Sequence, residues 1–370
     1  MLTILFYTLV CIVIFQLIYY MAIYSPIAFS NRSKTKENVD LAVSIVVYIK
    51  DNEKELPTFL ESLTTQNYSR FELILVNNAS EDESLTILET FAQQYSNVKI
   101  VNVQNNEAFW GNKKYALTLG IKVASCDYLL LTDPTTILGS SNWIAGMCQN
   151  FTTRKQVVIG YSELERRKKS LSNKFLRYQN SLKYINLFSW GEISKPAFGN
   201  AKNQAYSKEL FFKNNGFIKQ MNIPYGDEYG FIRLIATKAN ATITLNPDTF
   251  TINPVKNSFS NWREQVKTTN LLLRNTSWLT CLKFKILNFS TLCFYIVFSI
   301  IICNLYLWEF AIAVFLFRYL IAFFYTNKML KKFAQKDLIW LFPILEFTHV
   351  LSGTYYSLIH LISRKKIERR

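Results

Sequence analysis

A single acid follows a predicted strand in the stretch YLLLTDPTTI, residues 128–137. Tyr128–Thr132 has the composition of a buried strand. Asp133 follows it directly, and the next residue, a proline, ends the extended run. A carboxylate at the C-terminal end of a strand is typical of the rim of a nucleotide site. In the stretch VNNAS, Asn77 and Asn78 follow another predicted strand in the same way. Turn preferences leave open that Asn77 and Asn78 form a plain Asx turn, and that Asp133 is a turn residue or helix N-cap.

The elements that must position these residues are short strands alternating with helices. Buried strands are predicted at Val43–Tyr48, Phe71–Val76, Val98–Val103 and Tyr128–Thr132. Helical periodicity is found between them, at Leu56–Thr65, Glu83–Gln94 and Lys113–Ala124. This alternation predicts βαβ units and a parallel sheet, whose ligands lie outside the C-terminal ends of its strands. The first strand–helix turn, YIKDNEKEL, has no glycine, which disfavours a nicotinamide dehydrogenase.

Long apolar runs flank this region on both sides. Leu2–Ile23 is uncharged and has the roughly 20 residues that a bilayer-spanning helix needs, although a cleaved signal peptide is the alternative. Basic residues follow it in the sequence NRSKTK, which predicts that the next domain is cytoplasmic. Ile286–Cys303 and Tyr306–Tyr325 are predicted to form a transmembrane hairpin, with Arg318 either paired or snorkelling.

The last apolar segment, Leu338–Ile362, is long enough to cross a membrane but contains Pro343 and Glu346. It has basic residues at both ends, so an interfacial or re-entrant segment is at least as consistent with the sequence. We therefore expect an N-terminal anchor (1–29), a cytoplasmic domain (41–275) and a C-terminal membrane region (280–370, with the hairpin at 286–325 and the further segment at 338–362).

Charge and composition narrow the classes of function. The net charge is +16, but the basic residues border the apolar runs, which fits anionic lipid headgroups better than nucleic acid. The six cysteines form no C-x-x-C pair, so a disulfide framework or a zinc site is not expected. Both histidines lie in the last apolar segment, which excludes histidine-based catalysis in the soluble part.

Six stretches occur in a fixed order: VSIVVYIKDNEKELPTFLESLTTQNYSRFELILVNNASED, GNKKYALTLGI, YLLLTDPTT, GNAKNQAYSKELFFKNNGF, GDEYGFI and NWREQVK. Their order and spacing resemble the inverting glycosyltransferase family 2, particularly a membrane-anchored bacterial subgroup, over roughly residues 41–275. The resemblance implies an α/β fold of the GT-A type, with a Rossmann-like, mostly parallel sheet, flanking helices and transmembrane helices at both ends.

The resemblance also implies donor-binding residues. Asn78 occupies the strand end where the family has an acid that accepts a hydrogen bond from the donor's base. Lys113 matches the family's Gly-Lys position near the donor phosphates, although Asn112 replaces the glycine and a solvated helix-face lysine is the alternative. Asp133 falls on the first acid of the family's Asp-x-Asp motif, beside the ribose and the metal–diphosphate. Thr135 replaces the second acid, so Asp133 would hold a divalent metal, Mg²⁺ or Mn²⁺, only weakly, or lysines would take its place.

The acidic pair in GDEYGFI corresponds to the family's catalytic position. Glu228 would be the general base and Asp227 its acidic neighbour, unless both only favour the start of a helix.

The segment NWREQVK contains Trp262, Arg263 and Gln265, which would contact the leaving group or the acceptor. An interfacial helix is the alternative reading of this segment. In the acceptor-side segment GNAKNQAY, Lys202 and Asn203 are further candidates, whereas Asp82 is expected to cap a helix.

These features predict an enzyme of the cell inner membrane, multi-pass, with a cytoplasmic catalytic domain. It would transfer a sugar, with inversion, from a nucleotide-sugar donor (a UDP-sugar first) to a lipid-linked or envelope glycan. Its partners would be donor, acceptor and membrane lipids, and not nucleic acid. Two alternatives remain: a catalytically reduced relative that binds nucleotide sugar or glycan without transfer, and a membrane scaffold protein.

Overall fold

The computed structural model describes residues 1–30, 40–104, 112–221, 223, 229–254, 263, 266–270, 273 and 276–367, with side chains to residue 355. The chain forms two compact units. The first combines residues 1–30, 168–190 and 257–370 and is called the helical unit. The second combines residues 31–167 and 191–256 and is called the α/β unit. Each is described by itself.

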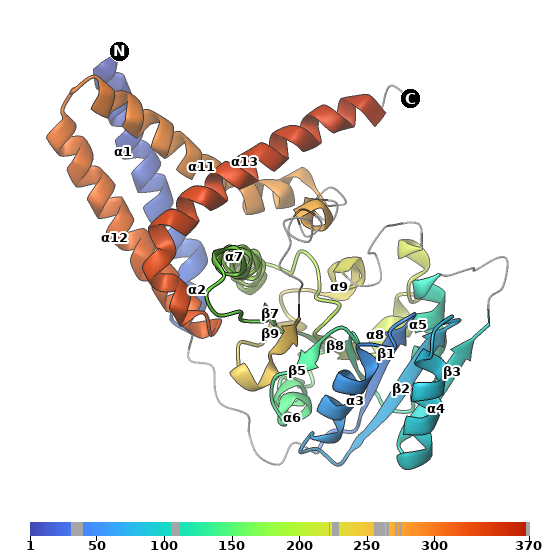
Figure 1. Cartoon of the computed structure of the whole chain (residues 1–370). Coiled ribbons are helices and arrows are strands. Elements are labelled where there is room, and N and C mark those ends of the chain that lie inside the picture. Colours follow the sequence, from blue (N-terminus) through green and yellow to red (C-terminus); the bar gives the residue numbers. More distant parts are fainter. Residues whose placement is uncertain are drawn as a thin grey trace. The chain divides into compact units, whose positions relative to one another are not determined.

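The α/β unit is built on a seven-stranded sheet with the strand order β3-β2-β1-β4-β8-β6-β9 (Figure 1). Its strands are β1 (Val43–Ile49), β2 (Phe71–Asn78), β3 (Val98–Val103), β4 (Tyr128–Thr132), β6 (Val157–Ile159), β8 (Gln204–Ser207) and β9 (Ala241–Ile243). Of these strands only β8 runs against its neighbours, β4 and β6. The predicted parallel α/β sheet is confirmed, and its first four strands occur where the sequence places them.

Helices connect the parallel strands. They are α3 (Leu56–Thr64), α4 (Ser84–Gln94) and α5 (Lys113–Val123), followed by α6 (Trp143–Cys148), α8 (Lys208–Lys213) and α9 (Phe231–Ile235). A small second sheet has the order β5-β10-β7, from Ile137–Leu138, Thr251–Asn253 and Ser162–Leu164. The apolar core joins β1, β2 and β4 to α3 and α6, with Phe59 and Trp143 fully buried.

Helix α5 lies unusually close to the sheet. A Cβ atom added at Gly120 would come within 2.4 Å of the Val76 side chain on β2 and 3.2 Å of Val46 on β1. Only glycine therefore permits this approach without a shift of α5. Because α5 begins at Lys113, this packing also sets the height at which Lys113 stands above the end of the sheet.

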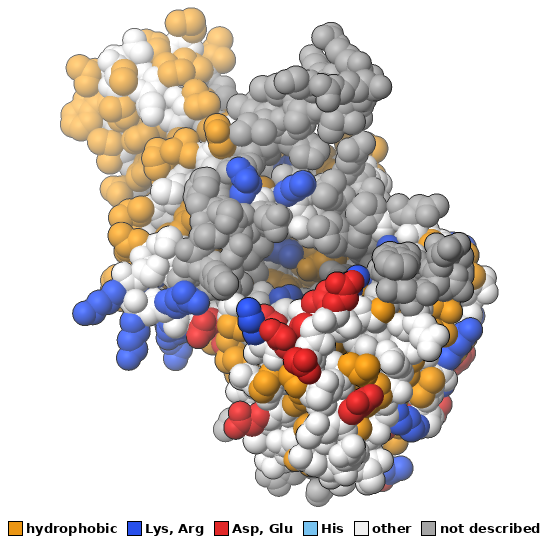
Figure 2. All heavy atoms as spheres, turned by 45° about the vertical axis from the view of Figure 1, so that its right-hand side comes forward, with side chains coloured by type: hydrophobic (Ala, Val, Ile, Leu, Met, Phe, Trp, Pro, Cys, Tyr) orange, Lys and Arg blue, Asp and Glu red, His pale blue; other side chains and the backbone are white. Residues whose placement is uncertain are grey.

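Three helices of the helical unit are long and apolar enough to cross a membrane, within the described part of the chain. They are residues Leu2–Ala28, composed of α1 (Leu2–Tyr19), a π-helical turn (Tyr20–Tyr24) and α2 (Ser25–Ala28), together with α11 (Trp278–Cys303) and α12 (Trp308–Lys332). In Figure 2 hydrophobic side chains cover one part of this unit and basic side chains gather at its opposite end. Helices of suitable length and composition thus occur where the anchor and the hairpin are expected.

A buried ion pair answers the question raised by Arg318. Its guanidinium makes two hydrogen bonds to Glu346, with nitrogen–oxygen distances of 2.7 and 2.8 Å. Its Nε donates to Gln16 at 2.8 Å, and Tyr295 donates to Glu346 at 3.0 Å. Arg318 is 1% exposed, so it is paired and does not snorkel. A charge buried at this depth is tolerated because each of its polar groups has a partner.

Two further helices complete the helical unit. They are α7 (Leu171–Ile193), of which residues 191–193 belong to the α/β unit, and α13 (Phe342–Ile367), which follows a 3₁₀ helix, η6 (Lys336–Leu341). Within the described part of the chain, α13 is not among the helices that are long and apolar enough to cross a membrane. Helix α7 lies inside the predicted cytoplasmic domain of the sequence, yet it clusters with the membrane helices.

Candidate functional site

The strand order places a crevice at the ends of β1 and β4. Chain connections leave β1 towards β2 on one side, whereas β4 lies on its other side, so the order reverses between these two strands. Open α/β sheets bind ligands outside the strand C-termini at this point. Val47 pairs with Thr132, which puts the following residues, Tyr48 and Asp133, next to each other at the rim. A small cavity there is lined by Tyr48, Lys113 and Asp133.

Asp133 is held as a carboxylate by its surroundings. Its Oδ1 accepts hydrogen bonds from the backbone N–H of Thr135 at 2.9 Å and from the Thr135 hydroxyl at 2.5 Å. Burial by itself would raise the pKa of Asp133, but Lys202, Lys113 and these hydrogen bonds together lower it below its ordinary value. Asp133 is therefore negatively charged near neutral pH.

Lys202 stands beside Asp133, next to the residue that replaces the second acid. Its ammonium donates to the Thr135 hydroxyl at 2.9 Å and to Asn253 Oδ1 at 3.0 Å. The Thr132 hydroxyl donates to the Lys202 carbonyl at 3.2 Å, which fixes the Lys202 backbone to the end of β4. The sequence offered Lys202 only as an acceptor-side candidate, because its distance from residue 135 along the chain hides this contact.

Lys113 reaches the same cavity from the first turn of α5. Its ammonium lies 5.0 Å from the centre of the Tyr48 ring, a cation–π distance. The preceding residue, Asn112, is the N-cap, and its Oδ1 accepts from the backbone N–H groups of Lys114 and Tyr115 at 3.0 and 3.3 Å. The Asn112 side chain thus occupies backbone amide groups that could otherwise bind a phosphate. An anion at this position would therefore be bound mainly by the charge of Lys113 and less by the helix terminus.

The two asparagines at the end of β2 differ in their surroundings. Asn77 donates to Asn102 at 2.8 Å and accepts from the Ser80 hydroxyl at 2.6 Å, a turn-stabilising arrangement. Asn78 donates from Nδ2 to the Tyr48 hydroxyl at 3.0 Å. This bond fixes the orientation of the Asn78 amide and leaves its Oδ1 as the atom suited to accept from an imide N–H.

The described residues do not form an ordinary divalent metal site. They contain no group of three or more His, Cys, Asp or Glu side chains suited to hold a metal ion. Asp133 Oδ1 is already engaged by Thr135, and the ammonium of Lys202 lies 2.9 Å from the Thr135 hydroxyl. A divalent ion there would face a fixed positive charge in place of a second carboxylate.

The other predicted catalytic and leaving-group residues are not found in the crevice of the described structure. Asp227, Glu228, Trp262 and Gln265 lie outside the described residues. Arg263 is exposed and belongs to the helical unit.

Two polar residues of the α/β unit have structural roles. Asn203 is fully buried and donates to the carbonyls of Tyr161 and Thr249 at 2.8 and 2.7 Å. Asp82 precedes Glu83, the N-cap residue of α4, and accepts from the backbone N–H of Ser84, the first residue of that helix, at 3.0 Å.

Comparison with known proteins is consistent with this geometry. The family profile described as Glycosyl transferase family 2 matches residues 44–211. The glycosyltransferase GlyG of Streptococcus pneumoniae serotype 4 is 31% identical over 119 residues, which are 32% of this chain and 38% of that protein. The poly(ribitol-phosphate) beta-glucosyltransferase of Bacillus spizizenii is 29% identical over 127 residues, 34% of this chain and 19% of the relative. The chain thus spans well under half the length of these curated relatives.

A solved structure shares the fold over most of the chain. It is the mannosyltransferase PcManGT from Pyrobaculum calidifontis, determined in complex with GDP-Man and Mn²⁺. Its TM-score is 0.56 at 13% identity, with 95% of this chain and 99% of that chain covered. The predicted GT-A-type fold is confirmed by this match.

Proposed function

Through residues 44–211 the chain belongs to glycosyl transferase family 2, and from this premise we propose that it transfers a sugar from a nucleotide-sugar donor at the β1–β4 crevice. The observation that carries the proposal is the group formed by Asp133, Thr135 and Lys202, with Lys113 across the cavity. A nucleoside diphosphate leaves with negative charge, and two ammonium groups beside the ribose-side acid are suited to bind and stabilise it.

The base and the phosphates of the donor would be held by different residues. Asn78 Oδ1 would accept from the imide of the base, and Asp133 would lie against the ribose. Lys113 and Lys202 would neutralise the diphosphate, in the role that a divalent ion has in relatives with two acids. UDP-sugars are the first donors to test, because uracil presents an imide N–H to Asn78.

The transfer itself would be a single displacement with inversion. Glu228 would remove the proton from the acceptor hydroxyl as that oxygen attacks the anomeric carbon, and the nucleoside diphosphate would leave with the electron pair of the broken bond. Asp227 would orient the acceptor, while Arg263, with Trp262 and Gln265, would contact the leaving group or the acceptor.

The arrangement of the apolar helices and lysines supports a location for the reaction. Lys331 and Lys332 end α12, and Lys332 donates to the carbonyl and hydroxyl of Ser30, at the end of the first span. At the opposite end of the same helices, the Thr3 and Tyr306 hydroxyls are hydrogen-bonded at 2.9 Å. By the positive-inside rule the lysine-rich end and the catalytic domain (41–275) would face the cytoplasm, with the protein in the cell inner membrane. A lipid-linked or envelope glycan is then the expected acceptor.

Calorimetry with UDP and with uridine tests the donor site. The lysines contact only the phosphates, so Lys113→Met and Lys202→Met should each weaken UDP binding by about 10–100-fold, the value of a charge-assisted hydrogen bond, and leave uridine binding unchanged. Lys122→Met, an exposed lysine on the same helix as Lys113, is the matched control and should bind UDP normally.

Product analysis across uridine, guanosine and thymidine donors then tests transfer. Binding of a nucleotide sugar without transfer would identify a catalytically reduced relative. Absence of binding to every donor would leave a membrane scaffold. Equal loss of UDP and uridine binding in Lys202→Met would show that Lys202 is structural and not phosphate-binding.

A further inference from the structure

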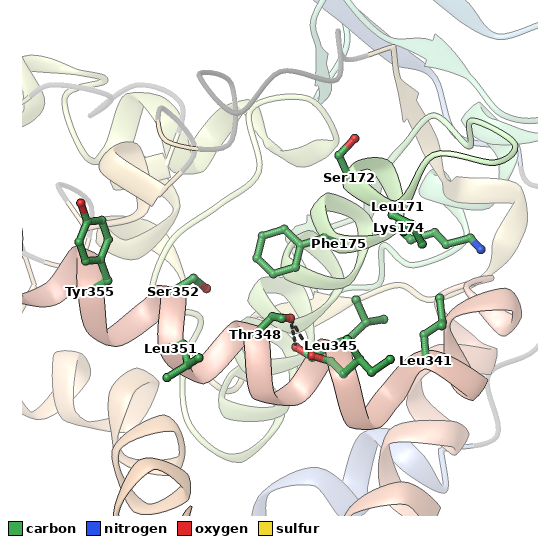
Figure 3. Close-up of a pocket in the computed structure, with 11 residues that line it drawn as sticks. Leu171, Ser172, Lys174, Phe175, Leu341, Leu345, Thr348, Leu351, Ser352 and Tyr355 are labelled. Atoms are coloured by element: carbon green, nitrogen blue, oxygen red, sulfur yellow. Dashed lines mark hydrogen bonds between the residues drawn. The ribbon is translucent and has the colours of Figure 1, made fainter.

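A large apolar groove runs between α7 and the η6–α13 segment, within the helical unit (Figure 3). Its volume is about 670 Å³, within the range of small-molecule sites. Leu171 and Phe175 line it from α7, while Leu345, Leu351 and Tyr355 line it from α13. In Figure 3 the Phe175 ring points across the groove towards α13.

Two hydroxyl groups that α13 contributes to the groove, Thr348 and Ser352, donate to backbone carbonyls of the same helix. Thr348 donates to the carbonyls of Ile344 and Leu345 at 2.8 and 3.1 Å, as the dashed lines in Figure 3 show. Ser352 donates to the His349 carbonyl at 3.0 Å. These side chains therefore present mainly their carbon atoms to the groove, which favours a hydrocarbon ligand over a sugar or a nucleotide.

An ion pair between a buried arginine and a partly exposed aspartate joins the two walls. Arg177 on α7 is 1% exposed and forms two hydrogen bonds to Asp337 of η6, at 2.8 and 2.7 Å. Its Nε donates to Gln335 at 2.8 Å. Breaking this pair would leave the Arg177 guanidinium buried without its carboxylate, which opposes separation of the two walls. The shape of the groove is fixed before a ligand arrives.

The groove is continuous with an exposed apolar stripe on α13 and the end of η6. Trp340, Ile344, Phe347, Leu351 and Tyr355 are 47–86% exposed and recur at intervals of three or four residues, which puts them on one face of the helix. A helix with this pattern lies in the membrane interface, with its apolar face among lipid chains. The same unit carries the three helices that are long and apolar enough to cross a membrane, so a lipid is the hydrocarbon ligand that this groove would meet.

A second pocket, with more polar side chains in its lining than the groove, adjoins it along the same pair of helices. Gln179 lies where the two cavities meet: it donates to Ser352 of the groove at 3.4 Å and contacts Nδ1 of His349, which lines the second pocket, at 2.5 Å. Lys183 of α7 and Lys285 of α11 line this second pocket, and none of the described residues lining it is acidic.

Asn288 adds an unusual acceptor to the polar pocket. Its Oδ1 is buried and has no hydrogen-bond partner among the described residues. A Cβ atom at Gly353 would lie 2.7 Å from Asn288 Nδ2, so the glycine makes room for this amide. Together the lysines and amides are suited to an anionic headgroup that also carries a hydroxyl.

We propose that α7 and α13 bind one anionic lipid, with its hydrocarbon tail in the apolar groove and its phosphate in the pocket formed by Lys183 and Lys285. The proposed binding of this lipid rests on the two cavities alone. That this lipid is the carrier of the sugar acceptor rests on the proposed function. The site would then select acceptors by tail and headgroup phosphate, independently of the donor crevice in the α/β unit.

Photo-crosslinking of the full chain in lipid nanodiscs tests the site. The probe is phosphatidic acid with a diazirine in its acyl tail, and the comparison lipid is diacylglycerol with the same tail. The phosphatidic acid probe should label peptides 171–175 and 341–355. Diacylglycerol should label them about tenfold less at equal concentration, because it lacks the charged hydrogen bonds to the lysines.

Two matched pairs of variants separate the tail from the headgroup. Thr348→Phe fills the groove and should reduce labelling about tenfold, since exclusion of two methylene groups has that effect. Thr354→Phe is its control: Thr354 has the same i−4 hydrogen bond, at 2.8 Å to Val350, but does not line the groove. Lys285→Gln should reduce labelling by phosphatidic acid only, and Lys283→Gln, two residues away and outside the pocket, should not.

Equal labelling of Thr348→Phe and Thr354→Phe would overturn the tail site. Equal labelling by phosphatidic acid and diacylglycerol in the unmodified chain would overturn the headgroup site. If Thr348→Phe does not fold, Lys285→Gln still tests the headgroup site, because Lys285 is exposed and its replacement leaves the helix packing intact; unchanged labelling by phosphatidic acid in Lys285→Gln would then overturn the proposal. UDP calorimetry on the same samples keeps this test distinct from the proposed function, because lipid labelling without UDP binding would refute only the latter.

Discussion

Thr135→Asp restores the second acid of the Asp-x-Asp pattern, and its effect on metal binding depends on Lys202. In the structure the Thr135 hydroxyl lies 2.5 Å from Asp133 Oδ1 and 2.9 Å from Lys202 Nζ. A carboxylate at this position would therefore pair first with the ammonium. The single variant should gain little affinity for Mn²⁺.

The magnitude follows from Coulomb's law. A divalent ion bound by two acids at positions 133 and 135 would lie roughly 5 Å from the Lys202 ammonium, and at an effective dielectric constant of about 20 their repulsion is about 7 kcal/mol. Even after Lys202 swings away, a residual few kcal/mol would remain. The double variant Thr135→Asp with Lys202→Met adds the acid and removes the lysine charge. It should therefore bind Mn²⁺ far more tightly than either single variant, with a coupling free energy above about 1.4 kcal/mol, or tenfold in Kd.

Mn²⁺ titration in the presence of UDP, followed by electron paramagnetic resonance, measures all four proteins of this cycle. Thr135→Asn with Lys202→Met serves as the control, because it removes the lysine without adding an acid. If Thr135→Asp alone binds Mn²⁺ as tightly as the double variant, Lys202 does not occupy the position of the metal. If no variant gains affinity, residue 135 does not face the diphosphate at all.

Three further outcomes are expected. Glu228→Gln should reduce transfer by about 10²–10⁴-fold while calorimetry shows unchanged donor binding, because a general base contacts the acceptor; a parent-like rate would leave the acidic pair as a helix start. Glu72, buried among Lys99, Ser125 and Ser44 at 2.5–2.7 Å, has a pKa of about 2, since these partners outweigh the effect of burial. The stabilisation of the fold by the Glu72 carboxylate is complete above the unfolded pKa of 4.5 and is lost as pH falls towards 2. Glu72→Gln should therefore lower the free energy of unfolding by about 2 kcal/mol at pH 7, allowing for the half-exposed Lys99. In urea unfolding, the free energy of unfolding of this variant should depend less on pH between 4.5 and 2 than that of the parent. Gly120→Ala should destabilise the fold by about 1–3 kcal/mol through its clash with Val76 and weaken UDP binding through a displaced Lys113, whereas a normal UDP affinity would separate α5 packing from the site.

Hydrophobic patterning along the chain was sufficient to predict the first four strands, the three helices between them and the spanning helices. These elements are specified by local periodicity, and their order determines a parallel sheet with its ligand edge at the strand ends. The positions of Asn78, Lys113 and Asp133 at one edge follow from the same reasoning, because each comes at the end of a strand or the start of the following helix.

Contacts between residues far apart in sequence could be decided only by the tertiary structure. Lys202 meets Thr135 across 67 residues, and Arg318 meets Glu346 and Gln16 across 28 and 302 residues. No local pattern encodes such pairs, since each depends on how separate elements pack. The same is true of α7, whose composition resembles that of a soluble helix but which packs through the buried Arg177 with η6, and so with the membrane helices. Local sequence determined which segments are strands and spans, whereas three-dimensional packing decided which charges meet, because a buried charge must find its partner wherever the fold brings one within hydrogen-bonding distance.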